Sequence, residues 1–192
     1  MDRRTFFQLA AIGALMSDAV STSADAQGTP GALDPQNTIY MDVKGGRVVI
    51  RLRPDLAPKH VERVKLLAHE HFYDGTPFHR VIDGFMAQGG DPTGTGTGGS
   101  KYPDLVAEFS TTTHYLRGTV GAARTQNPNT ANSQFYICFA PAPFLDGQYT
   151  IWGQVVSGME YIDALKKGAG SSGSVTNPDK IIKMRLMAEE NT

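Results

Sequence analysis

Short segments that alternate apolar and polar residues recur along most of this chain from residue 39 onward. Alternation with a period of two is typical of a β-strand that buries one face. Two pairs of these segments flank the glycine-containing turns Lys44-Gly45-Gly46 and Asp83-Gly84, which indicates two β-hairpins. The pattern predicts eight strands: Ile39–Val43, Arg47–Leu52, Phe78–Ile82, Phe85–Gly89, Thr119–Ala123, Gln134–Phe139, Ile151–Val155 and Ile181–Met187.

Two other segments follow the helical period. The first, PKHVERVKLLAHE, begins at Pro58, and the second, Met159–Lys167, ends just before Gly168. Eight short strands with two helices predict an all-β fold, an eight-stranded antiparallel closed barrel capped by two α-helices, because closure removes exposed strand edges. Residues 91–106 and 124–133 form loops long enough to favour a functional role.

The segment FHRVIDGFMAQGGDP, residues 78–92, places two polar side chains, Arg80 and Gln88, among apolar ones. A guanidinium group in apolar surroundings needs hydrogen-bond partners or a ligand. One interpretation is a surface arginine on a strand. The other is a shallow apolar pocket with one cation directed into it.

The N-terminus resembles an export signal. Arg3-Arg4 precede an apolar run, Phe6–Met16, that is too short to span a bilayer, and Ala24-Asp25-Ala26 fits a cleavage site. The pattern predicts a signal peptide at 1–26, a linker at 27–36, a folded domain at 37–190 and a periplasmic protein. The paired arginines favour the twin-arginine route, and an ordinary secretory signal is the alternative.

Composition narrows the classes of partner. Without residues 1–26, Lys plus Arg and Asp plus Glu each number 16, down from 18 and 19. A balanced charge predicts no binding to nucleic acid and, in the mature form, no binding to membranes. Cys138 is the only cysteine, so no internal disulfide can form. We expect a monomer.

Three other motifs do not indicate a cofactor site. The run from Gly94 to Gly99 fits G-x-G-x-x-G, but no helical pattern follows it, so we expect a tight loop and no nucleotide. His69 and His71 are two residues apart on a helix end and diverge, so we expect no metal. Cys138 lies between apolar neighbours and is expected to pack as a small hydrophobic residue. We therefore expect no cofactor.

Two long stretches resemble the signature regions of the cyclophilins, which are peptidyl-prolyl cis-trans isomerases. They are FYDGTPFHRVIDGFMAQGGDPTGTGTGG and SQFYICFAPAPFLDGQYTIWGQVVSGME, and the resemblance covers about residues 38–188. It implies an eight-stranded antiparallel barrel capped by two helices, as the strand pattern predicts independently.

The resemblance also implies the site. Arg80, Phe85 and Gln88 match the catalytic positions, and the substrate-binding positions match Met86, Ala123, Arg124, Gln134, Tyr136, Phe144, Leu145 and Tyr149. The backbone of Ala123-Arg124 matches the segment that holds the peptide, although the loop after it is one residue longer than in the familiar eukaryotic pattern. Three side chains depart from the usual ones: Tyr136 replaces phenylalanine, Phe144 replaces tryptophan, and Tyr149 replaces histidine. In the family, that tryptophan donates its indole N–H to the cyclic peptide drug cyclosporin.

These features predict an enzyme that rotates X–Pro bonds in exported proteins and assists their folding. Its partners would be proline-containing polypeptides. The alternative is a proline-peptide-binding chaperone module with weak catalysis. Tyr149 keeps this alternative open, because many members of the family carry histidine at that position.

Overall fold

The computed structural model describes residues 32–190. The predicted signal peptide and residues 27–31 of the predicted linker lie outside the described residues. The helical segments are α1 (Pro58–His69), α2 (Met159–Asp163) and the 3-10 turns η1 (Pro35–Asn37), η2 (Pro143–Leu145) and η3 (Met187–Glu189). The strands are β1 (Thr38–Val43), β2 (Gly46–Leu52), β3 (Arg80–Ile82), β4 (Met86–Gly89), β5 (Thr119–Ala122), β6 (Phe135–Cys138), β7 (Ile151–Ser157) and β8 (Lys183–Leu186).

All eight predicted strands and both helices are present, with ends shifted by a few residues. The folded part begins earlier than the predicted residue 37, because Pro35–Asn37 form η1. The Asp34 carboxylate caps this turn by accepting hydrogen bonds from the Gln36 amide and the Asn37 side chain.

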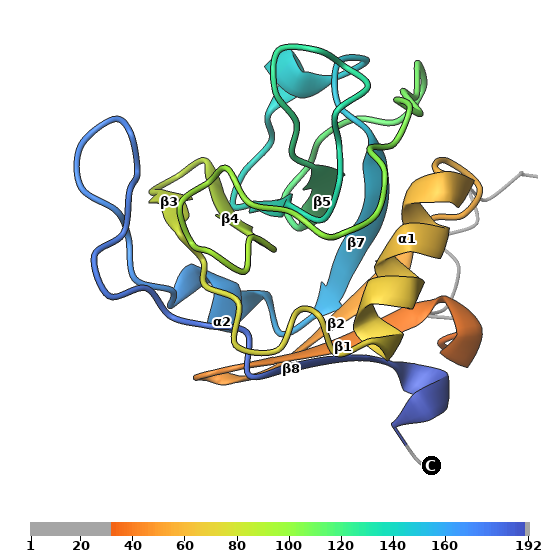
Figure 1. Cartoon of the computed structure of the whole chain (residues 1–192), viewed down its shortest axis with the longest axis horizontal. Coiled ribbons are helices and arrows are strands. Elements are labelled where there is room, and N and C mark those ends of the chain that lie inside the picture. The colour runs from red at the N-terminus through yellow and green to blue at the C-terminus, as the bar shows by residue number, and fades with distance from the viewer. Residues whose placement is uncertain (1–31, 191–192) are drawn as a thin grey trace, which may run out of the picture. The chain divides into compact units, whose positions relative to one another are not determined.

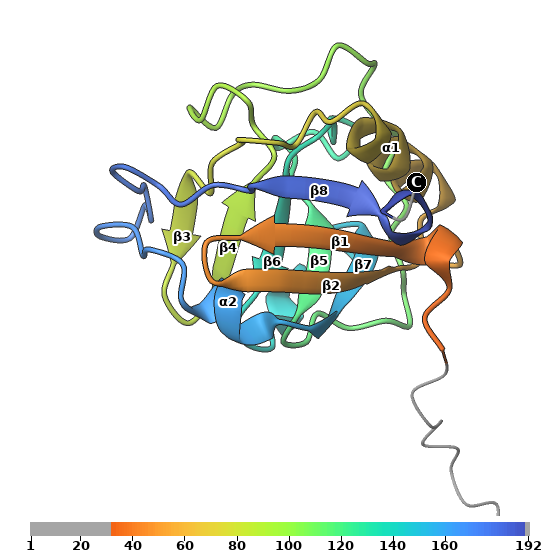
Figure 2. The same ribbon diagram turned by 90° about the horizontal axis from the view of Figure 1, so that it is seen from below.

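The strands form one antiparallel sheet in the order β3-β4-β6-β5-β7-β2-β1-β8. The sheet curls so that β8, β1 and β2 cross in front of β4, β6 and β5 (Figure 2). Both predicted hairpins are present. The β1–β2 turn is Lys44-Gly45, and the β3–β4 turn contains Gly84 at φ +69°, a conformation that glycine adopts without strain.

The curled sheet is not closed by a continuous strand ladder. The edge strands β3 and β8 do not pair with each other, and the segments that precede them meet around Pro77 and Lys180, where they form an isolated bridge and a few backbone hydrogen bonds. The outer edge of β3 pairs instead with the segment Gly168–Val175. The predicted eight-stranded antiparallel fold is thus confirmed. The sheet forms a half-barrel, because a loop covers the edge of β3 at which a closed barrel would continue.

The helices cover opposite ends of the curled sheet (Figure 1). α1 packs against β8 and β7, and α2 packs against β2. α1 has no side-chain cap of its own, and Glu108 supplies one by accepting hydrogen bonds from the Lys59 and His60 amides. Within residues 32–190 no helix is long and apolar enough to cross a membrane.

The buried side chains form two clusters on opposite faces of the sheet. On β6, Phe135 and Ile137 belong to the main core, whereas Tyr136 and Cys138 belong to a smaller cluster outside the curl. On β4, Ala87 points into the main core and Met86 points outward. The alternation of a strand therefore sends every second side chain toward the outer face, where the candidate site lies.

Candidate active site

A row of residues on the outer face crosses four strands. In the antiparallel register Arg80 lies opposite Gln88, Gln88 opposite Tyr136, and Tyr136 opposite Gly121. Residues paired in this way point to the same face of a sheet. The pairing explains why two polar residues interrupt the apolar 78–92 segment: they face the outer cluster and the site, not the main core.

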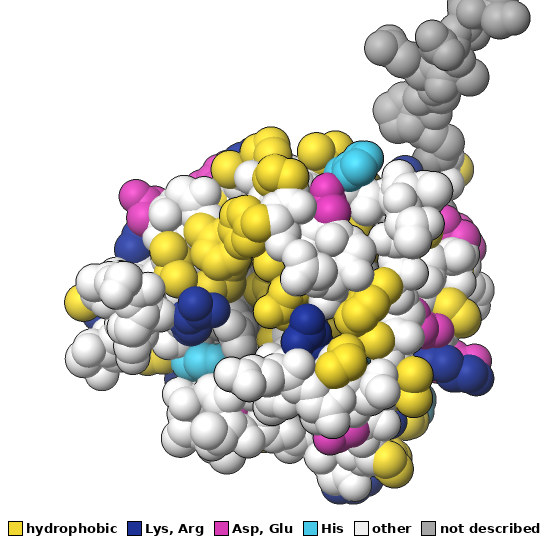
Figure 3. All heavy atoms as spheres, turned by 90° about the horizontal axis from the view of Figure 1, so that it is seen from above, with side chains coloured by type: hydrophobic (Ala, Val, Ile, Leu, Met, Phe, Trp, Pro, Cys, Tyr) yellow, Lys and Arg dark blue, Asp and Glu magenta, His cyan; other side chains and the backbone are white. Residues whose placement is uncertain are grey.

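A cavity of about 390 Å³ lies over this row. Its wall includes the apolar side chains of Phe85, Met86, Tyr136 and Leu145, and the Phe85 and Phe144 rings contact each other with centroids 5.3 Å apart. Figure 3 shows hydrophobic side chains gathered around a hollow, with Lys or Arg side chains at its rim. The lining residues are Arg80, Phe85, Met86, Gln88, Ala123, Arg124, Tyr136, Phe144, Leu145, Gln148 and Tyr149.

Arg80 is held from two sides at the edge of this cavity. Its Nη1 donates to Gln88 Oε1 at 3.2 Å, and its Nε donates to the Ser172 carbonyl oxygen at 3.0 Å. No ion pair links Arg80 to a carboxylate within residues 32–190. The positive charge beside the cavity is therefore not neutralised by a neighbouring acid, and it can act on a ligand.

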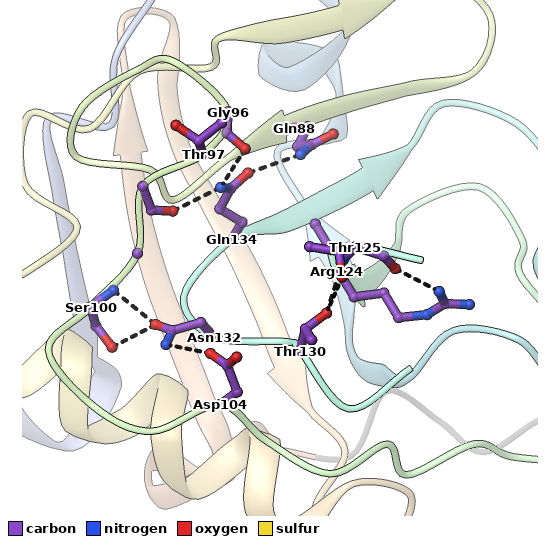
Figure 4. Close-up of a pocket in the computed structure, with 13 residues that line it drawn as sticks. Gln88, Gly96, Thr97, Ser100, Asp104, Arg124, Thr125, Thr130, Asn132 and Gln134 are labelled. Carbon is purple, nitrogen blue, oxygen red and sulfur yellow. Dashed lines mark hydrogen bonds between the residues drawn. The ribbon is translucent and has the colours of Figure 1, made fainter. Parts of the chain in front are cut away.

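The orientation of Gln88 is fixed by a second glutamine. Gln88 Nε2 donates to Gln134 Oε1 at 3.0 Å, and Gln134 Nε2 donates to the carbonyl oxygens of Gly96 and Gly98 (Figure 4). Because each amide donates at one end and accepts at the other, Gln88 must present its oxygen to Arg80. Gln134 thus orients the residue that holds Arg80.

Asp91 fixes the glycine loop at the far end of this chain of hydrogen bonds. Its buried carboxylate accepts hydrogen bonds from the Thr93 hydroxyl and from the amides of Thr93, Gly96 and Gly98. Burial opposes ionisation of Asp91, but these hydrogen bonds outweigh it and lower its pKa to about 2. The loop is therefore a tight backbone structure built around one carboxylate.

A second cavity, of about 490 Å³, adjoins the first and shares Gln88, Ala123 and Arg124 with it. It is mostly polar, and Figure 4 shows Ser100, Asn132 and Thr130 along its edge. Gln134, which was predicted to bind substrate, lines this cavity and not the apolar one. The other ten predicted site residues all line the apolar cavity.

Arg124 and Tyr149 close one side of the apolar cavity together. The Arg124 guanidinium lies 4.2 Å from the centroid of the Tyr149 ring and donates to the carbonyl oxygens of Thr125 and Gln148. In the segment Ala123-Arg124, which was predicted to hold the peptide through its backbone, the Ala123 amide donates to the Gln134 carbonyl oxygen.

Tyr136 lies at the floor of the apolar cavity, and Tyr115 packs behind it in the outer cluster. The Tyr136 ring stacks on Tyr115 with centroids 5.9 Å apart, and both hydroxyl groups lie in the space left by the missing side chain of Gly121. Burial raises the pKa of both tyrosines well above the usual range. Both hydroxyl groups are therefore uncharged at neutral pH.

The cysteine next to the cavity is not activated as a nucleophile. Cys138 is buried in the outer cluster, and burial raises the pKa of its thiol to about 12, which leaves no thiolate at neutral pH. Within residues 32–190 no group of three His, Cys, Asp or Glu side chains could hold a metal ion.

Sequence reasoning missed four features of the site. They are the Ser172 carbonyl, the Asp91 carboxylate, Gln148 and the close approach of Gly121 to two tyrosines. The paired glycines followed by Asp91-Pro92 are a pattern from which a turn at residue 91 could have been predicted. Nothing in the local pattern indicated that residue 172 would contact Arg80.

Comparison with known proteins gives a consistent result. The model of the cyclophilin-type peptidyl-prolyl cis-trans isomerase family matches residues 38–186. A probable peptidyl-prolyl cis-trans isomerase of Brucella suis is 53% identical over 182 residues, covering 88% of this chain and 92% of the relative. The isomerase ppi1 of Schizosaccharomyces pombe is 43% identical over 141 residues, covering 72% and 91%.

Solved structures agree. The cyclophilin AquaCyp293 from Hirschia baltica aligns with a TM-score of 0.73 at 25% identity, covering 82% of this chain and 76% of that one. A cyclophilin-type isomerase of Cryptosporidium parvum, crystallised in the presence of the dipeptide Ala-Pro, aligns with a TM-score of 0.71 at 28% identity, covering 78% and 98%.

Proposed function

Because the chain belongs to the cyclophilin-type peptidyl-prolyl cis-trans isomerases, we propose that it rotates X–Pro bonds in the apolar cavity beside Arg80, and that its substrates are exported proteins. The isomerase activity follows from the family. The location of the reaction, the role of each residue and the cellular context are the proposal.

The reaction needs a group that favours the twisted amide. The X–Pro bond has partial double-bond character, and its rotation barrier is about 18–20 kcal/mol. Twisting the bond removes conjugation and returns a basic lone pair to the proline nitrogen. A cation directed at that nitrogen binds the twisted state better than the planar one, and only such differential binding accelerates the step. A rate gain of about 10⁵ requires roughly 7 kcal/mol of this preference.

Arg80 is suited to supply that cation. An arginine stays charged in apolar surroundings, and Arg80 has no carboxylate partner within residues 32–190. Gln88 and the Ser172 carbonyl hold the guanidinium in place, which avoids reorganisation during the reaction. This pre-oriented, unneutralised cation at an apolar cavity is the observation that carries the proposal.

The other residues of the cavity bind different parts of the substrate. Phe85, Met86, Tyr136 and Leu145 provide an apolar wall for the pyrrolidine ring of proline. The backbone at Arg124 would hold the residue before proline, so that one side of the bond is fixed while the other turns. No cofactor or covalent intermediate enters this mechanism.

The dipeptide Ala-Pro is a suitable probe of the location. In an NMR titration, we expect Ala-Pro to shift amide signals of residues 85–88, 123–124 and 144–149 and to leave unchanged those around Tyr161, which line a separate cavity of about 260 Å³. The wild-type protein should also accelerate cis–trans exchange of an Ala-Pro peptide. Catalysis with shifts confined to the Tyr161 cavity would overturn the proposed site.

Export rests on the sequence of residues 1–26 alone. The paired arginines, the short apolar run and the small-residue cleavage pattern support a signal peptide that delivers the folded domain to the periplasm. The single cysteine is compatible with an oxidising compartment, because no disulfide is needed to stabilise the fold.

A further inference from the structure

The segment Gly168–Val175 pairs with the outer edge of β3, directly behind Arg80. The Gly168 amide donates to the Val81 carbonyl oxygen at 2.8 Å, and the Val81 amide donates to the Gly173 carbonyl oxygen at 2.7 Å. The Val175 amide donates to the His79 carbonyl oxygen at 3.0 Å. These bonds occupy the backbone on both sides of Arg80, so the segment is registered on the strand that carries the arginine.

The same segment also contacts the side chain of Arg80. Its Ser172 carbonyl oxygen accepts a hydrogen bond from Arg80 Nε at 3.0 Å. Gln88 takes the Nη1 end of the guanidinium. The Nε–H and Nη1–H bonds both lie in the rigid plane of the guanidinium group, so acceptors at these two positions restrict the turning of that plane. Two anchors on different elements together set the direction of the charge.

Gly173 is the residue that allows this close approach. Its φ is +69°, and an added Cβ would overlap Cγ1 of Ile82 and lie 3.1 Å from the Val81 carbonyl oxygen. Gly170, in the same segment, also has a positive φ, +62°, but nothing lies within 4 Å of the Cβ position there. Both glycines satisfy a left-handed backbone, and only Gly173 is also required by contact with β3.

We propose that the segment Gly168–Val175 is a positioning element for the reaction, which orients the Arg80 guanidinium through the Ser172 carbonyl and depends on Gly173 for its contact with β3. The inference rests on the proposed role of Arg80 and extends it to a part of the chain far away in sequence. Ser172 and Gly173 do not line the substrate cavity. They act through Arg80.

The test compares Gly173→Ala with Gly170→Ala. Both variants introduce a side chain at a positive φ, so their backbone strain is matched, but only the first displaces the segment from Val81 and Ile82. With an Ala-Pro peptide in exchange NMR, we expect Gly173→Ala to lower kcat at least tenfold with KM changed less than threefold. Gly170→Ala should remain within twofold of wild type. A folded Gly173→Ala variant with wild-type turnover, or equal losses in both variants, overturns the inference.

A double mutant separates positioning from general destabilisation. In an Arg80→Ala background the segment has no guanidinium to orient, so adding Gly173→Ala should leave the residual rate unchanged within twofold. A further tenfold loss would show that the segment acts by another route. If Arg80→Ala alone keeps wild-type turnover, the proposed function of Arg80 fails. If Arg80→Ala loses turnover and Gly173→Ala does not, only the positioning role fails.

A measurement on the unmodified protein covers the case in which Gly173→Ala does not fold. The Nε proton of Arg80 should exchange with solvent at least tenfold more slowly than that of Arg51, which is exposed on β2. Equal exchange rates would show that the Ser172 carbonyl does not hold Arg80 in solution, and the inference would fail.

Discussion

At the residue scale, the site depends on the small size of one glycine as well as on its larger side chains. Gly121 lies opposite Tyr136 in the sheet, and its lack of a side chain leaves room for the hydroxyl groups of Tyr136 and Tyr115. The tyrosine that departs from the usual phenylalanine is thereby accommodated at the cavity floor.

Gly121→Ala should therefore impair the pocket. A Cβ there would lie 2.8 Å from the Tyr136 hydroxyl oxygen and would overlap that of Tyr115. We expect a loss of roughly 1–3 kcal/mol in unfolding free energy and a tenfold or greater fall in kcat/KM, measured by denaturant unfolding and exchange NMR. Gly153→Ala is the control, because its Cβ would crowd Ile50 on β2, away from the cavity. Similar falls in kcat/KM for both variants would contradict the role of the cavity floor.

Phe144 is the residue whose departure from the family pattern should change drug binding. Its side chain is 62% exposed and packs on Phe85, but phenylalanine has no hydrogen-bond donor. If cyclosporin binds here as the resemblance implies, one drug carbonyl loses its partner, which costs about 1–3 kcal/mol, or roughly 5- to 150-fold in affinity.

We therefore expect weak inhibition of the wild-type enzyme by cyclosporin. Phe144→Trp should tighten inhibition at least fivefold and change turnover less than twofold. Titration of the drug against both proteins checks this. Nanomolar inhibition of the wild type would contradict the argument, and a tryptophan variant with no gain would direct attention to Tyr149 or the longer 124–133 loop.

At the scale of elements, the glycine loop after β4 is stabilised by one ionised carboxylate. The amides of Gly96 and Gly98 donate to Asp91, and their carbonyl oxygens accept from Gln134, which orients Gln88. The loop therefore connects a buried charge to the anchor of Arg80 by hydrogen bonds alone.

The ionisation of Asp91 should be visible as a pH dependence of stability. Its pKa in the folded protein, about 2, lies below the unfolded value near 3.8, so its contribution is fully present above about pH 4 and is lost as the pH falls toward 2. Asp91→Asn should cost roughly 1–3 kcal/mol at pH 7, because amide donors lose a charged acceptor. The difference between the two proteins should shrink from pH 4 to pH 2 in denaturant unfolding. A constant difference would contradict the assignment.

The elements were largely predictable from the sequence, and their long-range contacts were not. Alternating residues such as those of 39–43 and 47–52, with a glycine turn between them, specify a hairpin locally. The contact between Ser172 and Arg80 spans 92 residues, and it depends on which segment covers the edge of β3. Similarly, the polarity of Gln88 was evident, but its orientation depends on Gln134, whose contacts with the glycine loop the local pattern does not specify.

At the scale of the whole molecule, the two faces of the curled sheet have different roles, one in stability and one in the site. The inner face holds the main core that stabilises the fold, and the outer face holds the smaller cluster under the substrate cavity. Because the strands alternate between these faces, substitutions at the outer positions can alter the site while the main core stays intact.

Export also belongs to this scale, because a twin-arginine route carries a folded domain. If that route is used, replacing Arg3-Arg4 by Lys-Lys should reduce the amount of protein in the periplasm at least tenfold. A general secretory signal would tolerate the change. Fractionation followed by immunoblotting measures this, and N-terminal sequencing of the mature form should begin near Gln27. Undiminished accumulation would rule out the twin-arginine route and leave the secretory one.

The most direct test of the central claim is the turnover of Arg80→Ala on an Ala-Pro peptide, measured by exchange NMR at saturating peptide. The cavity wall is apolar and Arg80 stands at its edge, so we expect the variant to fold and to bind peptide within threefold of wild type. Its kcat should fall at least 100-fold, about 2.7 kcal/mol of transition-state stabilisation. A folded Arg80→Ala protein that turns over peptide at the wild-type rate would contradict the account.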